Sequence, residues 1–245
     1  MKLFLARKVL KVFDNINQRK ITNFLKFIFK KNFNIALDVG AHHGETILNL
    51  INNFNIKKIY AFEASNKNFL ELKRKIKNII SKTEIVLINN GVGEKKGFQN
   101  IKQTEESSSS TYSDIDENSS YFKKKKFFLY NNKKYFINEE TKLITLNNFF
   151  DQNKLQDADY LKIDTEGYEF FVLKGFDKYI KKVKVVHFEH HYDNMLIKKY
   201  KFSDIHNLLI NNNFYNSFKI KMFFRKSFEY IYLNNIFFKK KTNFL

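Results

Sequence analysis

The chain of 245 residues has room for one α/β domain with a single hydrophobic core. It contains no cysteine, which excludes a disulfide framework, thiolate metal ligands and a cysteine nucleophile, and fits a cytoplasmic location. The net charge of +19 raises the question of an anionic partner. The surplus of Lys, Asn, Ile and Phe is typical of an AT-biased genome, so we expect mostly solvated charge and favour this over a nucleic-acid partner; a charged glycan, a lipid or RNA is the alternative.

Residues 1–34 are expected to form a basic helical segment ahead of the domain, because apolar residues such as Leu3, Val9 and Phe13 recur at roughly helical spacing. This segment either docks on the domain or contacts a partner or an anionic membrane surface. Its apolar start is interrupted by Arg7 and Lys8, so we expect neither a membrane span nor a secretory signal.

From residue 35 onward, short apolar runs alternate with helical patterns. The expected strands are 35–40, 57–65, 84–93, 160–167 and 182–191, and the helices between them are 44–54, 68–80 and 168–181. Strands that alternate with helices at this spacing predict βαβ units and a parallel sheet.

The end of the chain predicts an antiparallel closure of that sheet. A helix at 203–213 precedes two aromatic-rich runs that flank Arg225–Ser227, a pattern typical of a hairpin. We therefore expect a Rossmann-like α/β domain at 35–245, with a mostly parallel seven-stranded sheet and a C-terminal hairpin. Within it, the polar stretch 98–142 is interpreted as a surface insertion with a small hairpin or as a lid over a substrate.

The sharpest motif is ALDVGAHHGET at 36–46, where a strand delivers Asp38 to a turn that contains Gly40 and Gly44. Backbone N–H groups at the start of the following helix can bind a carboxylate or a phosphate. The next strand ends at Glu63, and an acidic residue at that place can accept hydrogen bonds from ribose hydroxyls. Together these features predict a nucleotide-like ligand at the strand ends.

These motifs, with ITLNNFF at 144–150 and LKIDTEGYEFFVLKGF at 161–176, resemble the FkbM family of S-adenosylmethionine (SAM) dependent methyltransferases. The last stretch is similar to the family's L-K-[IL]-D-[VT]-E-G-x-E pattern and is the most diagnostic. The chain departs from the family at His42, where Asn is usual, at Ala64, where Pro is usual, and at Asn147, where Asp is usual.

The resemblance implies SAM as cofactor and a set of residues around it. Glu63 would hold the ribose, and Ser109 and Ser110 match a serine-containing stretch of the family. The cofactor-binding residues are predicted to be Asp38, Gly40, Ala41, Gly44, Glu63, Asn90, Gly91 and Val92.

Candidates for catalysis follow two later strands. They are Asp164, Glu166, His190 and His191, because transfer to a hydroxyl needs a group that removes a proton. We expect the fourth and fifth strands to be adjacent only through the first strand. Alternation would place His187, Glu189 and His191 on one face of the fifth strand, and His190 on the other. A divalent metal held by Asp164, Glu189 and His190 is a weaker alternative.

The resemblance favours O-methylation of a hydroxyl on a glycan, a sugar-containing metabolite or another small-molecule acceptor. A ribose 2′-O-methyltransferase acting on RNA is one alternative, since the proline-containing motif of amino-group methylators cannot occur in a chain without proline. A catalytically silent binding module with the same fold is another.

Overall fold

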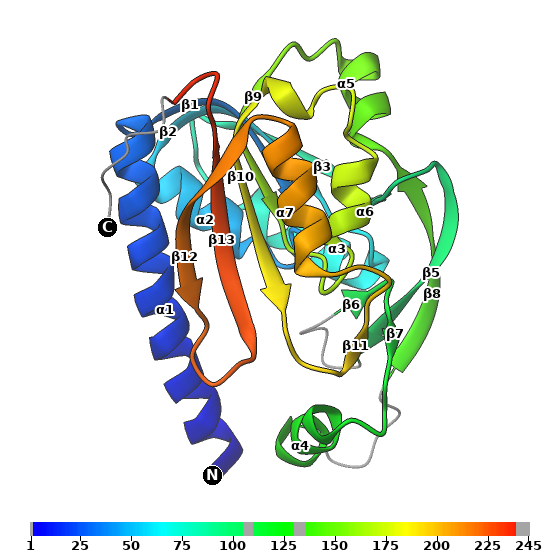
Figure 1. Cartoon of the computed structure of the whole chain (residues 1–245). Helices are drawn as coiled ribbons and strands as arrows, with labels where there is room; N and C mark the ends of the chain where they lie inside the picture. The colour runs from blue at the N-terminus through cyan, green and yellow to red at the C-terminus, as the bar shows by residue number, and fades with distance from the viewer. Residues whose placement is uncertain (1, 105–109, 130–135, 239–245) are drawn as a thin grey trace.

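The computed structural model describes residues 2–104, 110–129 and 136–238. Its centre is a seven-stranded sheet in the order β12-β13-β10-β9-β1-β2-β3 (Figure 1). The strands are β1 (Asn32–Val39), β2 (Asn55–Phe62), β3 (Glu84–Ile88), β9 (Ala158–Ile163), β10 (Val183–His191), β12 (Phe214–Lys221) and β13 (Ser227–Asn234). The first five are parallel, whereas β13 pairs antiparallel with β10 and with β12. The predicted mostly parallel sheet with a C-terminal hairpin is therefore confirmed.

Helices cover both faces of the sheet. On one face lie α1 (Lys2–Phe29), α2 (Glu45–Asn53) and α3 (Asn66–Lys77), and on the other lie α5 (Leu146–Asn153), α6 (Glu169–Lys174) and α7 (Phe202–Asn211). Successive strand residues point to opposite faces, so Ala36 packs against the first helical layer and Leu37 against the second. A short 3-10 turn, η1 (Ile180–Lys182), leads into β10.

The expected relation between the fourth and fifth strands was wrong. Strand β9 pairs directly with β10, with Leu161 opposite Val186, and β1 lies on the other side of β9. The residues that follow β9 and the end of β10 are consequently direct neighbours, with no strand between them.

The predicted strand 84–93 is two separate elements. Strand β3 stops at Ile88, and β4 (Gly91–Val92) joins a second sheet in the order β4-β8-β5-β6. Its other strands are β5 (Gly97–Thr104), β6 (Ser110–Thr111) and β8 (Phe136–Ile144), and β5 and β8 pair along their whole length. The insertion is thus a small sheet rather than a short hairpin, and it carries α4 (Ser120–Leu129) between β7 (Asp114–Ile115) and β8. Strand β7 pairs with β11 (Leu196–Ile197).

The N-terminal segment forms one long helix that shares the core of the sheet. Ile21 and Leu25 of α1 are buried in the cluster that contains Ala36 of β1 and Leu50 of α2. Across the described part of the chain, no helix combines the length and the apolar character that a membrane span requires.

Candidate active site

A pocket lies where β1, β2, β4 and β9 end. Of the predicted cofactor-binding residues, five line it, namely Gly40, Glu63, Asn90, Gly91 and Val92. Ser110 and Tyr112 of the insertion close it from the second sheet, and Asp164 and Thr165 border it at the end of β9. Ser109 lies outside the described residues.

The glycine loop brings the ends of β1 and β9 close together. Gly40 has φ +86°, and a Cβ atom there would lie 2.0 Å from the carbonyl oxygen of Asp164. The backbone N–H groups of Gly40 and Ala41 both donate to the carbonyl oxygen of Phe62, each at 2.9 Å. Gly44, with φ 87°, precedes the first residue of α2. Gly40 lines the pocket, whereas Ala41 and Gly44 shape the loop.

Asp38 is buried at the end of β1, and neither carboxylate oxygen has a hydrogen-bond partner among the described residues. Burial raises the pKa of this carboxyl to about 7, although nearby Lys162 lowers it. A buried carboxyl without a donor is costly to a fold. Its side chain is therefore a candidate for a ligand that brings a hydrogen-bond donor.

Glu63 is held in one orientation by the backbone. One carboxylate oxygen accepts the N–H of His42 at 2.8 Å, and the other accepts the N–H of Ser65 at 3.0 Å. Burial raises the pKa of Glu63, and these bonds partly oppose the rise. Each oxygen retains a lone pair that a ligand hydroxyl can use. At the unusual position 42, His42 contributes its backbone N–H, and its ring stacks on that of His43 with centroids 3.8 Å apart.

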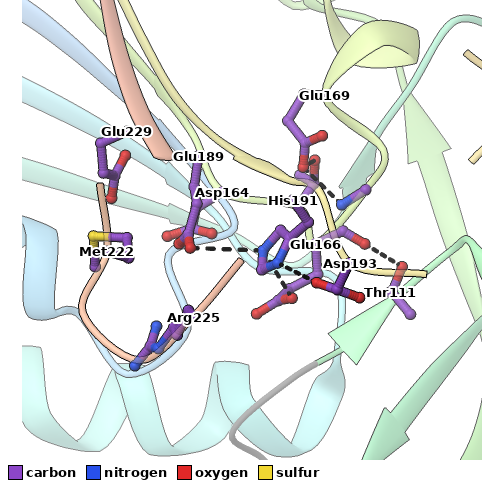
Figure 2. Close-up of polar contacts among 12 residues, drawn as sticks. Thr111, Asp164, Glu166, Glu169, Glu189, His191, Asp193, Met222, Arg225 and Glu229 are labelled. Carbon is purple, nitrogen blue, oxygen red and sulfur yellow. Dashed lines mark hydrogen bonds and ion pairs between the residues drawn. The ribbon is translucent and has the colours of Figure 1, made fainter. Parts of the chain in front are cut away.

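Beside the pocket, the sheet face under α1 carries a group of ionisable residues, which we call the charged cluster (Figure 2). It consists of Lys162, Asp164, Glu166, His187, Glu189, His191, Asp193, Arg225 and Glu229. The Lys162 ammonium lies 3.3 Å from Asp164 Oδ2 and 3.3 Å from Glu229 Oε2. The His187 ring lies between the Tyr160 hydroxyl, at 2.5 Å, and Glu229, at 2.8 Å.

Three carboxylates surround His191. Its Nε2 lies 3.2 Å from Glu166 and 3.7 Å from Glu189, and its Nδ1 lies 3.3 Å from Asp193. Burial alone would lower the pKa of His191, but the carboxylates outweigh it and raise the pKa to about 10. Burial raises the pKa of Glu189 to about 7. At neutral pH, His191 is therefore a fixed cation and not a proton acceptor.

His190 lies on the other face of β10, where its ring packs among aromatic side chains. The centroids of Tyr192, Phe202 and Tyr200 lie 4.9, 5.5 and 6.0 Å from it. Burial lowers its pKa to about 3. The structure therefore does not bring His190 together with Asp164 and Glu189, the predicted metal ligands.

Among the described residues, His42, His43 and Glu45 bring one possible metal-ligand atom each within 4.8 Å of one another. The Lys75 ammonium lies 3.8 Å from Glu45, and the group borders the amino end of α2. Both place positive charge beside the group and oppose a cation.

The insertion and the C-terminal hairpin bring residues to the site that the sequence alone does not reveal. Thr111 donates to the carbonyl oxygen of Glu166 at 2.6 Å, and Ser113 donates to that of Gly167 at 2.7 Å. Glu229 lies opposite Glu189 in the β10–β13 register. The alternation of residues along β13 predicts that Glu229 shares a face with Ile231. No local sequence signal, however, predicts the pairing of β13 with β10 that brings Glu229 opposite Glu189.

The family of the chain follows from its similarity to known proteins. The family model described as "Methyltransferase FkbM domain" matches residues 38–216. The chain belongs to the FkbM methyltransferase family. The match spans the glycine loop, Glu63 and most of the charged cluster, while α1 and β13 lie outside it. The predicted family is therefore confirmed.

Solved structures show the same fold at low identity. The FkbM methyltransferase of Methylobacillus flagellatus KT matches with a TM-score of 0.51 and 15% identity, over 80% of this chain and 43% of its own length. Magnesium protoporphyrin IX methyltransferase of Synechocystis PCC 6803, solved with bound SAM, matches with a TM-score of 0.54 and 10% identity, over 93% of this chain and 82% of its own. This FkbM chain thus spans less than half of the Methylobacillus protein. No curated protein matches the sequence.

Proposed function

We propose that this FkbM chain transfers a methyl group from SAM to a hydroxyl of a glycan or a sugar-containing metabolite. The observation that carries the proposal is the buried Asp38 carboxyl, which has no hydrogen-bond donor among the described residues. Asp38 directly precedes Val39 and Gly40, which line a pocket together with Glu63. A ligand with an amino group at one end and a ribose at the other would supply hydrogen-bond donors to the carboxyls of both Asp38 and Glu63. SAM is such a molecule.

The chain's own residues suit that cofactor. Asp38 would accept hydrogen bonds from the amino group of the methionine part, and Glu63, already oriented by His42 and Ser65, would accept those of the ribose. Asn90, Gly91 and Val92 would line the adenine side. When bound, SAM supplies an electrophilic methyl group on a sulfonium. The fold shared with a methyltransferase solved with SAM supports this assignment.

On the acceptor side, Asp164 is the proposed general base. It borders the pocket, and its carboxylate is held by the Lys162 ammonium at 3.3 Å. A hydroxyl placed there could pass its proton to this carboxylate as the methyl is transferred. Glu166 and the cationic His191 would orient the acceptor. His190 has no role in this proposal, because its ring lies on the far face of β10.

The charge of the cluster favours an acceptor without phosphates. Asp164 and Glu166 would repel an anionic backbone, so RNA ribose methylation is the second candidate despite the net charge of +19. The proposed location is cytoplasmic, as the absence of cysteine suggested.

Isothermal titration calorimetry with SAM tests the cofactor side. We expect the wild-type protein to bind SAM, and Glu63→Gln to weaken binding by roughly 1–3 kcal/mol because one ribose acceptor is lost. The matched control is Glu71→Gln on α3, an exposed acid that pairs with Arg74. A wild-type protein that fails to bind SAM would leave only the silent binding module.

Transfer of a labelled methyl group to a panel of neutral glycans and RNA transcripts tests the acceptor side. Asp164→Asn should bind SAM as tightly as wild type but lower turnover about a hundredfold or more, the usual loss of a general base. Wild-type turnover in Asp164→Asn would remove Asp164 from the mechanism. Labelling of RNA rather than glycans would reverse the ranking of acceptors.

A further inference from the structure

The turn that joins β12 to β13, residues 222–226, contains two adjacent exposed phenylalanines. We call this segment the hairpin tip. Phe223 is 37% exposed and Phe224 is 70% exposed. Exposed lysines, Lys221 and Lys226, flank the pair. Aromatic side chains surrounded by basic ones are typical of protein surfaces that enter the interface of a lipid bilayer.

Phe224 occupies a backbone conformation that a bulky residue rarely adopts. Its φ is 60°, in the left-handed region, where glycine is the residue that folds without strain. The ring gains little burial in return, because most of it faces solvent. Fold stability alone therefore gives no reason for a phenylalanine at this position, and a role in contact with another surface does.

Helix α1 holds the hairpin tip in place. The Phe13 ring lies 4.6 Å from that of Phe223 and 5.2 Å from that of Phe224, measured between centroids. Asp14 pairs with Arg225 at 2.9 Å, and the Asn17 side chain donates to the carbonyl oxygen of Lys221 at 3.1 Å. The two rings are thus presented on a supported turn.

Positive charge continues across the same end of the molecule. Figure 1 shows α4, the amino end of α1 and the hairpin tip together at that end. The side chains of Lys123, Lys124 and Lys126 on α4 are exposed. Asp116 and Glu117, which precede α4, are the acids nearest to them in sequence. Lysines of this kind are attracted to the anionic headgroups of a bilayer.

We propose that the hairpin tip and α4 dock on an anionic membrane surface, with Phe223 and Phe224 entering the lipid interface. Arg225 belongs to the hairpin tip and also to the charged cluster, where its charge interacts with those of Glu189 and Glu166 (Figure 2). Docking would therefore bring the proposed acceptor site to the bilayer. If the proposed function holds, the acceptor hydroxyl is carried by a lipid-linked molecule.

Sedimentation with vesicles tests the docking. The vesicles contain either phosphatidylcholine alone or equal parts of phosphatidylcholine and phosphatidylglycerol. We expect wild-type protein to bind the mixed vesicles much more tightly than the neutral ones. Phe224→Gly should bind the mixed vesicles roughly tenfold more weakly or worse, because the most exposed ring is lost. Phe98→Ser is the matched control, since Phe98 is 69% exposed on β5, outside the hairpin tip.

Phe224→Gly also separates docking from folding. Glycine adopts the φ of 60° without strain, so the unfolding midpoint of this variant should be unchanged or higher. Wild-type affinity for mixed vesicles in Phe224→Gly would overturn the proposal. So would light scattering that shows a wild-type dimer and a monomeric Phe224→Gly, because the hairpin tip would then contact a second copy. Vesicle binding needs neither SAM nor an acceptor, so its failure would leave the proposed methyl transfer untouched.

Discussion

At the scale of single residues, the charge of His191 depends on its neighbours more than on its own chemistry. Glu166, Glu189 and Asp193 surround the ring and raise its pKa to about 10. Its neighbour in sequence, His190, has a pKa of about 3 because burial among aromatic rings disfavours its cation. At neutral pH, His191 is thus a cation and His190 is neutral, because strand alternation places the two rings on opposite faces of the sheet.

This difference predicts how stability depends on pH. An unfolded histidine titrates near 6.5, so above that pH the folded protein holds a proton on His191 that the unfolded chain has released. The resulting stability is complete below about 6.5 and is lost as the pH rises toward about 10. Between pH 7 and 9, the free energy of unfolding should fall more steeply in wild type than in His191→Gln, by up to about 1.4 kcal/mol per pH unit.

Urea denaturation at both pH values measures the two slopes. Burial raises the pKa values of Asp38 and Glu189 to about 7. The stability that their protonated forms give to the folded protein is therefore lost mostly as the pH rises toward about 7, below the window between pH 7 and 9. Parallel slopes for the two proteins would mean that His191 is neutral at pH 7 and that the carboxylates do not hold its proton.

At the scale of elements, the insertion braces the loop that follows β9. In that loop Glu166 and Gly167 both have left-handed φ values, 50° and 94°. Thr111 and Ser113 donate to their two carbonyl oxygens, and Glu169 accepts the N–H of Gly167 at 2.8 Å. The strained loop is therefore held from outside by the second sheet, which makes the insertion a wall of the site.

Removing those two hydroxyls should loosen the loop. In Thr111→Val/Ser113→Ala, the part-buried carbonyl oxygen of Glu166 and the buried one of Gly167 lose their donors, at about 1–3 kcal/mol each. Hydrogen exchange of the amides of Glu166 and Gly167 should become faster, while that of the amides of β2 stays slow. Thr83→Val, before β3 and at the opposite end of the parallel strands, is the matched control. Unchanged exchange at Glu166 and Gly167 would show that the insertion does not support this loop.

The same elements show what the sequence could and could not predict. The strand runs IALDVG and KVKVVHFEHH carry strong local patterns, so β1 and β10 were predicted to within a few residues. Their order in the sheet was not, because the pairing of β9 with β10 depends on packing between distant segments. Gly91–Val92 also looked like the end of a strand, yet the partner that draws it away, β8, begins more than forty residues later.

The candidate site divides in the same way. Asp38 and Glu63 are found from motifs, because Asp38 lies at the end of a predicted strand just before a glycine turn and Glu63 lies at the end of the next strand. Tyr112 and Glu229 are not, because a polar insertion and a C-terminal hairpin bring them in from far along the chain. The hydroxyl of Tyr112 would clash with any side chain at Gly91, a contact that only the folded chain reveals.

At the scale of the whole molecule, α1 connects the matched region of the chain with the hairpin tip that follows it. Its carboxyl half packs on β1 and α2 through Leu25, and its middle holds the hairpin tip through Asp14 and Asn17. The helix lies before residue 38, where the match begins, and the hairpin tip lies after residue 216, where the match ends. We expect α1 to be part of the cooperative folding unit and not a detachable segment.

Two substitutions in α1 distinguish these possibilities. Leu25 is 1% exposed, whereas Phe27, two residues later, is 65% exposed. If α1 shares the core, Leu25→Ala should lower the free energy of unfolding by about 2–5 kcal/mol, the usual loss for a buried leucine. Phe27→Ala should cost well under half as much, because little of its ring is removed from water. Urea denaturation followed by circular dichroism gives both values and shows whether a single transition persists. An equally small cost for both variants, or a separate early transition, would mean that the sheet folds without α1.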